Sequence, residues 1–122
     1  MKSVKEIGEA LVDHCKKGEN AAAIAAYYAD DVVSVEAAAF PGVPKETRGK
    51  DAVLAKNRAW VETNHVHDSG VAGPFPHDDR FAVIFKYDVT NKQSNQRRKM
   101  EEVAVFTVRD GKIVREEFFY ST

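Results

Sequence analysis

One carboxylate lies where the surrounding sequence is apolar. Residues 32–36 read Val-Val-Ser-Val-Glu, a β-branched run that predicts a strand, and Glu36 closes it. Glu36 is therefore either an exposed strand end or a carboxylate placed in a pocket. In an apolar pocket the pKa of a carboxyl group rises because burial disfavours its charge, and a pKa near neutrality suits a general acid or base.

Two histidines are a second candidate for chemistry. His65 and His67 are two residues apart in a strand-like run, so they share one face, and Asp68 follows directly. Such a set could bind a metal or supply an Asp-supported acid or base, although an exposed strand edge also tolerates histidine. No third ligand is evident, so we expect no metal and treat His67 as a candidate proton-transfer residue. The chain has no phosphate-cradling loop, nucleophile elbow or dinucleotide fingerprint, and we expect no cofactor.

Composition excludes several classes of partner. The 122 residues fit one domain, residues 1–122, with a core of its own. With 18 basic and 19 acidic residues the chain has no field that would attract nucleic acid or an anionic membrane. Cys15 is the only cysteine, which is typical of a reduced intracellular protein. A charged, amphipathic stretch follows Met1, so we expect no signal peptide, and no run of about 18 apolar residues occurs. We therefore expect a soluble, cytoplasmic protein with no nucleic-acid or membrane partner.

Periodicity predicts the elements that must position these groups. Apolar residues at steps of three and four predict helices, and alternation predicts strands. The predicted helices are 4–17, 21–28 and one from Gly49 or Lys50 to Thr63, and the predicted strands are 32–36, 65–71, 80–90, 99–108 and 112–121. Ser3 with Glu6 predicts a capping box on the first helix, and Asn20 is the predicted N-cap of the second.

The order of these elements predicts an α+β domain. Three helices and a strand occupy the front of the chain, and four strands follow in a run, so the helices should cover one face of a curved, mostly antiparallel sheet. Such a cone can keep a ligand-sized cavity at its open end. Pro41, Gly42 and Pro44 predict a loop over 37–47 that could lid this opening, and Asp110-Gly111 suits a hairpin turn with positive φ.

Four stretches carry a resemblance to a known family. They are YYADDVV after the second helix, TRGKDAV at the entry to the third, DDRFAVIFKYDVT, and the closing hairpin MEEVAVFTVRDGKIVREEFFY. In this order and at this length the chain resembles the NTF2-like superfamily, and within it the small SnoaL-like proteins related to ketosteroid isomerase. The resemblance covers nearly the whole chain and implies an NTF2-like cone, three N-terminal helices packed on the curved sheet. It implies no single reaction, because these proteins share a shape and differ in use.

Function carries over from this resemblance only position by position. In ketosteroid isomerases the general base is the fifth residue after the second Asp of an Ala-Asp-Asp element, and that count from Asp31 reaches Glu36. The tyrosine that holds the oxyanion in those enzymes corresponds to Leu11-Val12, and their second oxyanion donor falls near Ala104. Neither position can donate a side-chain hydrogen bond, so steroid isomerisation is disfavoured, since oxyanion stabilisation usually dominates such catalysis.

The same resemblance indicates which strand face points into the cone. The inward residues are then Val83, Phe85 and Tyr87, followed by Met100, Glu102, Ala104 and Phe106, and finally Val114, Glu116, Phe118 and Tyr120. Glu102 becomes a candidate partner for Glu36, and Glu116 a candidate substrate-binding group, although both could instead form cross-strand ion pairs near a rim. The candidate ligand wall consists of Tyr28, Trp60, Phe85, Tyr87, Phe106, Phe118 and Tyr120, with simple packing as the alternative for Trp60.

The opposite sheet face is also apolar. Its residues are Ile84, Val103, Val105, Ile113 and Phe119. A second copy of the chain is the natural cover, so we expect a homodimer through this outer face.

Two functions fit these features. The first is a cofactor-free acid/base enzyme, an isomerase, dehydratase, cyclase or epoxide hydrolase, that acts on a small, apolar, oxygenated metabolite with Glu36 as base and His67 or Glu102 as partner. The second is a non-catalytic ligand-binding or dimeric scaffold module. They differ in whether polar groups converge on a vacant volume or aromatic side chains fill it.

Overall fold

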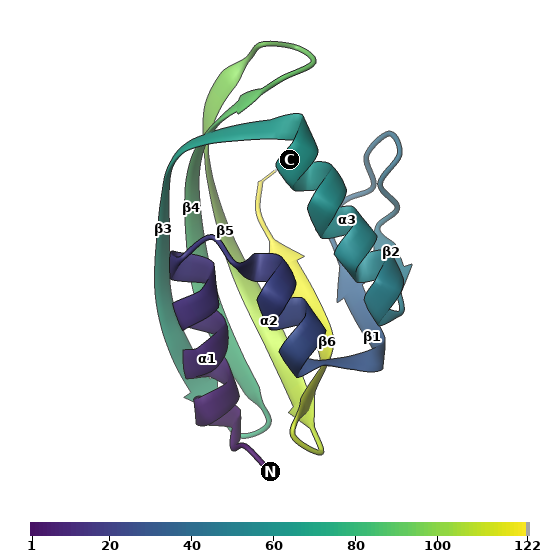
Figure 1. Ribbon diagram of the computed structural model, residues 1–122, viewed down its shortest axis with the longest axis vertical. Coiled ribbons are helices and arrows are strands. Elements are labelled where there is room, and N and C mark those ends of the chain that lie inside the picture. Colours follow the sequence, from purple (N-terminus) through teal and green to yellow (C-terminus); the bar gives the residue numbers. More distant parts are fainter. Residues whose placement is uncertain (122) are drawn as a thin grey trace.

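A curved six-stranded sheet with three helices on one face makes up the computed structural model, which describes residues 1–121 (Figure 1). The helices are α1 (Val4–Lys16), α2 (Asn20–Tyr27) and α3 (Lys50–Thr63), and the strands are β1 (Tyr28–Val35), β2 (Glu46–Arg48), β3 (Asn64–His77), β4 (Arg80–Asn91), β5 (Arg97–Arg109) and β6 (Lys112–Phe119). The predicted α+β class is confirmed. The helices are not all N-terminal to the sheet, because β1 and β2 lie between α2 and α3.

The strand order brings the two ends of the chain together. It is β2-β1-β6-β5-β4-β3, with β1 parallel to β6 and every other neighbouring pair antiparallel. The parallel pair sets Ser34 directly beside Glu116. A strand from the N-terminal third therefore shares an inward face with the last strand.

Local signals explain the helix ends. The predicted capping box is present, since the Glu6 amide donates to Ser3 Oγ at 3.1 Å and the Ser3 amide donates to Glu6 Oε1 at 2.9 Å. The predicted cap at Asn20 is wrong: Asn20 is the first residue of α2, and the N-cap Glu19 makes no side-chain cap hydrogen bond. Asn64 ends α3, where its side chain donates to the carbonyl of Trp60 at 3.0 Å.

The structure contains more strand than was predicted, in two places. Glu46 and Thr47 were expected in a loop but belong to β2, which pairs with β1. β3 was expected to end at Val71, before Gly73-Pro74, but it continues to His77 across a register shift between Ala72 and Phe75. An edge strand tolerates a proline because the ladder hydrogen bond that proline cannot donate would face outward.

A β-bulge changes the predicted face of β6 near its start. At the preceding hairpin, Asp110 and Gly111 have φ values of 51° and 74°, as the turn prediction requires. The register shifts between Thr107 and Val108, which pair with Arg115 and Ile113, so one residue of β6 is inserted. Ile113 is consequently buried in the core and Val114 is only half-buried, the reverse of the predicted assignment.

The core lies between the helices and one end of the sheet. Phe81 and Phe106 stack there at 4.8 Å between ring centroids, and α1 packs over them against β3 and β4. Gly8 allows this approach, because a Cβ at that position would lie 2.8 Å from Pro74 Cβ. None of the helices within residues 1–121 has the length and apolar character needed to cross a membrane.

Candidate functional site

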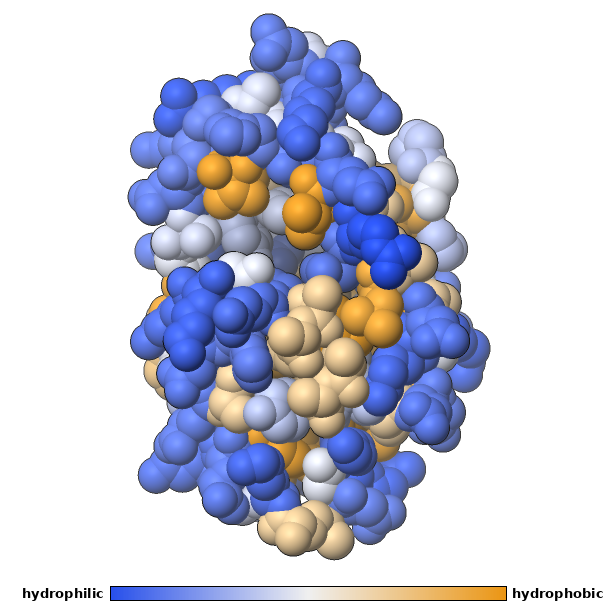
Figure 2. Space-filling model, viewed as in Figure 1, coloured by the Kyte–Doolittle hydropathy of each residue, from blue (hydrophilic) through white to orange (hydrophobic). Residues whose placement is uncertain are grey.

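The inner face of the sheet changes from a filled core to a partly exposed end. Phe85 and Phe106, both candidates for the ligand wall, are buried in the core, whereas Tyr87 is half-buried. We call the half-buried part the open end; it consists of Trp60, Tyr87, Met100, Glu102, Phe118 and Tyr120. In the space-filling view the surface is hollowed between the α1–α2 pair and α3, with apolar side chains beside the hollow (Figure 2).

Aromatic rings line one side of the open end. The rings of Trp60 and Tyr87 lie 5.2 Å apart between centroids at a tilted angle, and Tyr87 stacks on Phe85 at 6.1 Å. Burial raises the pKa of Tyr87, and the nearby Glu102 raises it further, so its phenol stays protonated. The rings therefore offer an apolar wall with a hydroxyl donor.

Glu116 is the most deeply buried carboxyl group of the site. Its side chain accepts hydrogen bonds from the hydroxyls of Tyr28 and Ser34, the latter at 2.6 Å. Burial raises the pKa of Glu116, and these two hydrogen bonds oppose that rise because they favour the ionised form. The pKa of Tyr28 is raised well above its ordinary value by burial and by Glu116, so Tyr28 remains the donor.

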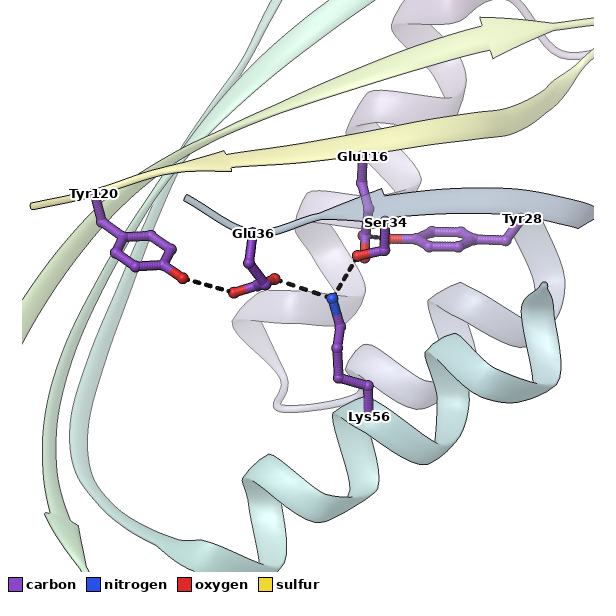
Figure 3. A network of polar contacts seen from close by, with 6 residues as sticks. All are labelled: Tyr28, Ser34, Glu36, Lys56, Glu116 and Tyr120. Carbon is purple, nitrogen blue, oxygen red and sulfur yellow. Dashed lines mark hydrogen bonds and ion pairs between the residues drawn. The ribbon is translucent and has the colours of Figure 1, made fainter. Parts of the chain in front are cut away.

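A chain of polar contacts through Lys56 connects the buried Glu116 to Tyr120 at the open end (Figure 3). From α3 the Lys56 ammonium donates to Ser34 Oγ at 2.6 Å and to Glu36 Oε2 at 3.0 Å. The other oxygen of Glu36 accepts from the hydroxyl of Tyr120 at 2.9 Å. Glu36 thus faces the interior rather than bulk water, with 18% of its side chain exposed, but both of its oxygens are engaged.

Glu102 lies on β5 directly beside Phe85 and within electrostatic range of the Lys56 chain. Burial is the main cause that raises its pKa to about 7; Glu36 and Glu116 raise it as well, and Lys56 lowers it. No hydrogen bond from the residues 1–121 stabilises its charged form. We call Glu36, Glu102 and Glu116 with Lys56 the carboxylate cluster.

The carboxylate cluster is suited to proton transfer. Its wall is aromatic, one carboxyl group titrates near neutrality, and protonated phenols and an ammonium are held in place beside it. Within residues 1–121 no group of three or more His, Cys, Asp or Glu side chains is arranged to hold a metal ion.

His67 is not brought to this cluster. It is exposed on β3 and its Nε2 lies 2.6 Å from Thr90 Oγ1. Thr90 belongs to the outer set of β4, because the inward set, from Phe81 to Val89, occupies the odd-numbered positions. His65 packs edge-on against His67 at 4.7 Å, so the two rings share a face as predicted, but it is the outer face.

Sequence reasoning missed Lys56 and Ser34. Ser34 lies between Val32 and Glu36 in a strand where alternate residues share a face, so its inward position was implied by the period of two. Lys56 follows Val53 by three residues and precedes Trp60 by four, which places all three on one side of α3. A lysine on an apolar helix face was the signal that could have identified it.

Two other hollows lie outside the carboxylate cluster. One is lined by Ala10, Asp13, His14, Lys17 and Tyr27, and the other by Asp88, Arg97, Arg98 and Lys99. In the second, Arg97 and Asp88 form a bidentate ion pair with both N···O distances at 3.0 Å. Neither contains a residue of the open end.

Comparison with solved structures finds the same fold in proteins of related description. A Mesorhizobium loti protein, described provisionally as a SnoaL-like polyketide cyclase, is 39% identical, with a TM-score of 0.92 over 98% of this chain and 100% of that one. An NTF2-like protein from Burkholderia thailandensis is 21% identical, with a TM-score of 0.83 over 99% of this chain and 92% of that one.

A third structure contains a small ligand. It is a Catenulispora acidiphila protein with a ketosteroid isomerase-like fold, solved in complex with trimethylamine; it is 17% identical, with a TM-score of 0.74 over 98% of this chain and 88% of that one. A comparison with curated proteins finds no match. Among protein families, the SnoaL-like domain matches residues 3–120. The resemblance drawn from the sequence is confirmed: the chain has the fold of NTF2-like proteins and belongs to the SnoaL-like family.

Proposed function

We propose that this protein binds a small, largely apolar, oxygenated compound at the open end and transfers a proton on it without a cofactor. The observation that carries the proposal is the carboxyl group of Glu102, which is half-buried beside aromatic rings and has a pKa of about 7. A group whose pKa lies near the working pH is available both as an acid and as a base.

The other side chains take supporting roles in this proposal. Glu36 holds Lys56 and Tyr120 in place, since each of its oxygens has a partner. That arrangement supports assigning proton transfer to Glu102 rather than to Glu36. Trp60 and Tyr87 form the wall against which the apolar part of the ligand packs. The proposal assigns no part to His67, because it lies on the outer face.

Carbonyl chemistry is the reaction class that these features favour. Cyclisation, isomerisation and dehydration of oxygenated compounds can all begin with removal of a proton from the carbon atom next to a carbonyl group. The Mesorhizobium loti relative is described provisionally as a polyketide cyclase, and polyketide chains carry acidic C–H groups between carbonyls. Removal of such a proton needs a base but no redox cofactor.

Hydrogen–deuterium exchange tests the proposal without knowledge of the natural substrate. A panel of aryl ketones, cyclic ketones and β-keto esters is incubated with the protein in D₂O, and loss of the α-proton is followed by NMR. We expect exchange of at least one compound to be faster than in buffer, with a rate that rises through a pH near the Glu102 pKa of about 7.

Glu102→Gln supplies the decisive variant, and Glu101→Gln the matched control, because Glu101 is the next residue on β5 and is exposed on the outer face. The proposal requires that Glu102→Gln reduce the exchange rate by about 100-fold or more, as for loss of a general base, and that Glu101→Gln leave it unchanged. Exchange that persists in Glu102→Gln, or is absent for the whole panel, would refute it.

A non-catalytic binding or scaffold module is the second candidate. It is favoured because the polar groups of the site already pair with one another: within residues 1–121 every buried side-chain nitrogen or oxygen has a hydrogen-bond partner. Phe85 and Phe106 also fill the deeper part of the inner face. Ligand binding at the open end with no proton exchange on any carbonyl compound favours this module over the enzyme.

Self-association through the outer sheet face belongs to either function. Phe75, Val103 and Phe119 are 54%, 38% and 53% exposed there in the single chain, and the half-buried Ile84 and Val105 lie between them. This surface supports the proposal of a homodimer, because contiguous apolar area of this kind usually marks an interface.

A further inference from the structure

We infer that Lys56 binds the negatively charged oxygen of the reacting compound, which makes enolate-forming carbonyl compounds the substrate class. The inference rests on the proposed function, because it assigns a ligand to the same open end.

The position of the ammonium carries the first step. Two of its hydrogens are directed to Ser34 and Glu36, at 2.6 Å and 3.0 Å, and an ammonium has three donors. The side chain is 19% exposed, and we assign its third donor to the ligand. Nζ also lies 5.5 Å from the centroid of the Phe118 ring, a member of the open end, so the cation borders the space where the apolar wall would hold a ligand.

The second step is preorganisation. Glu36 is held from its other oxygen by Tyr120, and Ser34 is held by Glu116, so the partners of Lys56 are themselves fixed (Figure 3). A cation fixed before the reaction stabilises a developing charge strongly, because little reorganisation is needed when the charge forms. Ordinary surface lysines lack such anchoring.

Lys56 is the only positively charged residue of the open end and the carboxylate cluster as defined above. The positions that correspond to the oxyanion donors of ketosteroid isomerases are apolar here, and Leu11 and Ala104 are 2% and 0% exposed. Lys56 supplies a donor from α3 instead. An enolate would otherwise face Glu36, Glu102 and Glu116 with no positive group nearby, which electrostatics disfavours.

The proton transfer balances within these groups. The carboxylate of Glu102 accepts the α-proton, the electron pair of the C–H bond forms a carbon–carbon double bond, and the carbonyl π electrons move to the oxygen. Lys56 donates a hydrogen bond to that oxygen. Return of the proton from Glu102 to carbon restores the carbonyl, and exchange of the Glu102 proton with solvent in between introduces deuterium.

A pair of probes distinguishes this role from a purely structural one. 4-Nitrophenolate carries a delocalised oxygen anion like an enolate, and nitrobenzene has nearly the same ring without that oxygen. Affinity for both is measured at pH 7.5 by calorimetry, and the absorbance of the phenolate shows which form is bound. The readout is the affinity for 4-nitrophenolate divided by the affinity for nitrobenzene. A general loss of packing weakens the binding of both probes and leaves this ratio unchanged.

Four variants test the ratio. Lys56→Met should lower it by about 10- to 100-fold, the size of a hydrogen bond to a charged group. Glu36→Gln should raise it, because the anion that competes for Lys56 is removed. Glu36→Gln/Lys56→Met removes the ion pair together and should lower the ratio as Lys56→Met does; this double variant decides the question if the single variant does not fold. Arg58→Met, which removes a positive charge from the exposed side of the same helix, should leave the ratio unchanged.

The outcomes separate this inference from the proposed function. If nitrobenzene binds and the ratio is unchanged in the double variant, Lys56 does not hold the oxygen and only the inference fails. If neither probe binds the wild-type protein, there is no ligand site at the open end, and the proposed function fails with it.

Discussion

Glu102 should destabilise the protein at neutral and alkaline pH. In the folded state its pKa is about 7, against an ordinary value of 4.5 that applies to the unfolded chain. Below the unfolded value both states carry the proton and no cost arises. As pH rises from there, the unfolded state loses its proton first, so the folded state becomes relatively less stable until pH passes the folded pKa.

The magnitude follows from the same two values. One pH unit of difference corresponds to about 1.4 kcal/mol, so the change from 4.5 to about 7 amounts to roughly 3 kcal/mol once Glu102 is ionised in both states. Glu102→Gln removes the charge and keeps the shape. It should therefore stabilise the protein at pH 8 by about 3 kcal/mol relative to its effect at pH 4.

Urea unfolding at pH 4, 5, 6, 7 and 8, at one protein concentration, measures this effect. Trp60 is the only tryptophan and packs against Tyr87, so its fluorescence reports the open end, and circular dichroism reports the sheet. Glu101→Gln is the control and should stay within about 0.5 kcal/mol of wild type at every pH, as for an exposed substitution. The raised pKa of Glu102 would be refuted if the unfolding free energies of Glu102→Gln and wild type differed equally at every pH, or if Glu102→Gln were less stable than wild type at pH 8.

Three further predictions concern the network, the core and the outer face. Tyr28→Phe should lower the free energy of unfolding by about 1–3 kcal/mol, because a buried oxygen of Glu116 loses this hydrogen-bond donor; urea unfolding measures the loss, and unchanged stability would contradict this. Gly8→Ala should destabilise by about 1–3 kcal/mol, since the new methyl would meet Pro74 at 2.8 Å; thermal unfolding beside an Ala10→Ser control on the same helix measures it, and unchanged stability would mean that α1 sits farther from β3. Phe119→Lys should reduce the mass measured by light scattering from that of a dimer to that of a monomer, whereas Lys112→Glu at the exposed start of β6 should not; a wild-type monomer would remove the proposed interface.

Much of the fold was predictable because it depends on local chemistry. The three helices begin and end within a residue or so of their predicted limits, since capping and apolar spacing act over a single turn. Alternation, with its phase taken from the family resemblance, assigned the inward face of β4 and β5 correctly, with Val83 and Ala104 buried. The extension of β3 past Pro74 was not predictable. A proline usually ends a strand, but it is tolerated in a strand at the edge of a sheet, and only the tertiary structure shows that β3 is such a strand.

The candidate site was predictable only in part. Glu36 was identified from its position in a strand, and Glu102 and Glu116 from the strand face that the resemblance indicated. The structure brings all three close enough to shift the pKa of Glu102. The helix face of Lys56 could have been predicted from the spacing of Val53 and Trp60, but its partners could not, because the contacts with Ser34 and Glu36 span 22 and 20 residues.

The sequence by itself determined every element except β2, their order and which carboxyl groups alternate with apolar neighbours, because these depend on spacing along the chain. Only the tertiary structure decided that β1 lies parallel to β6, that a bulge turns Ile113 inward, and that Lys56 enters between Ser34 and Glu36. Long-range pairing sets which charges meet and how far they are removed from water. A pKa near 7 at Glu102 is thus a property of the folded protein and not of residues 101–103.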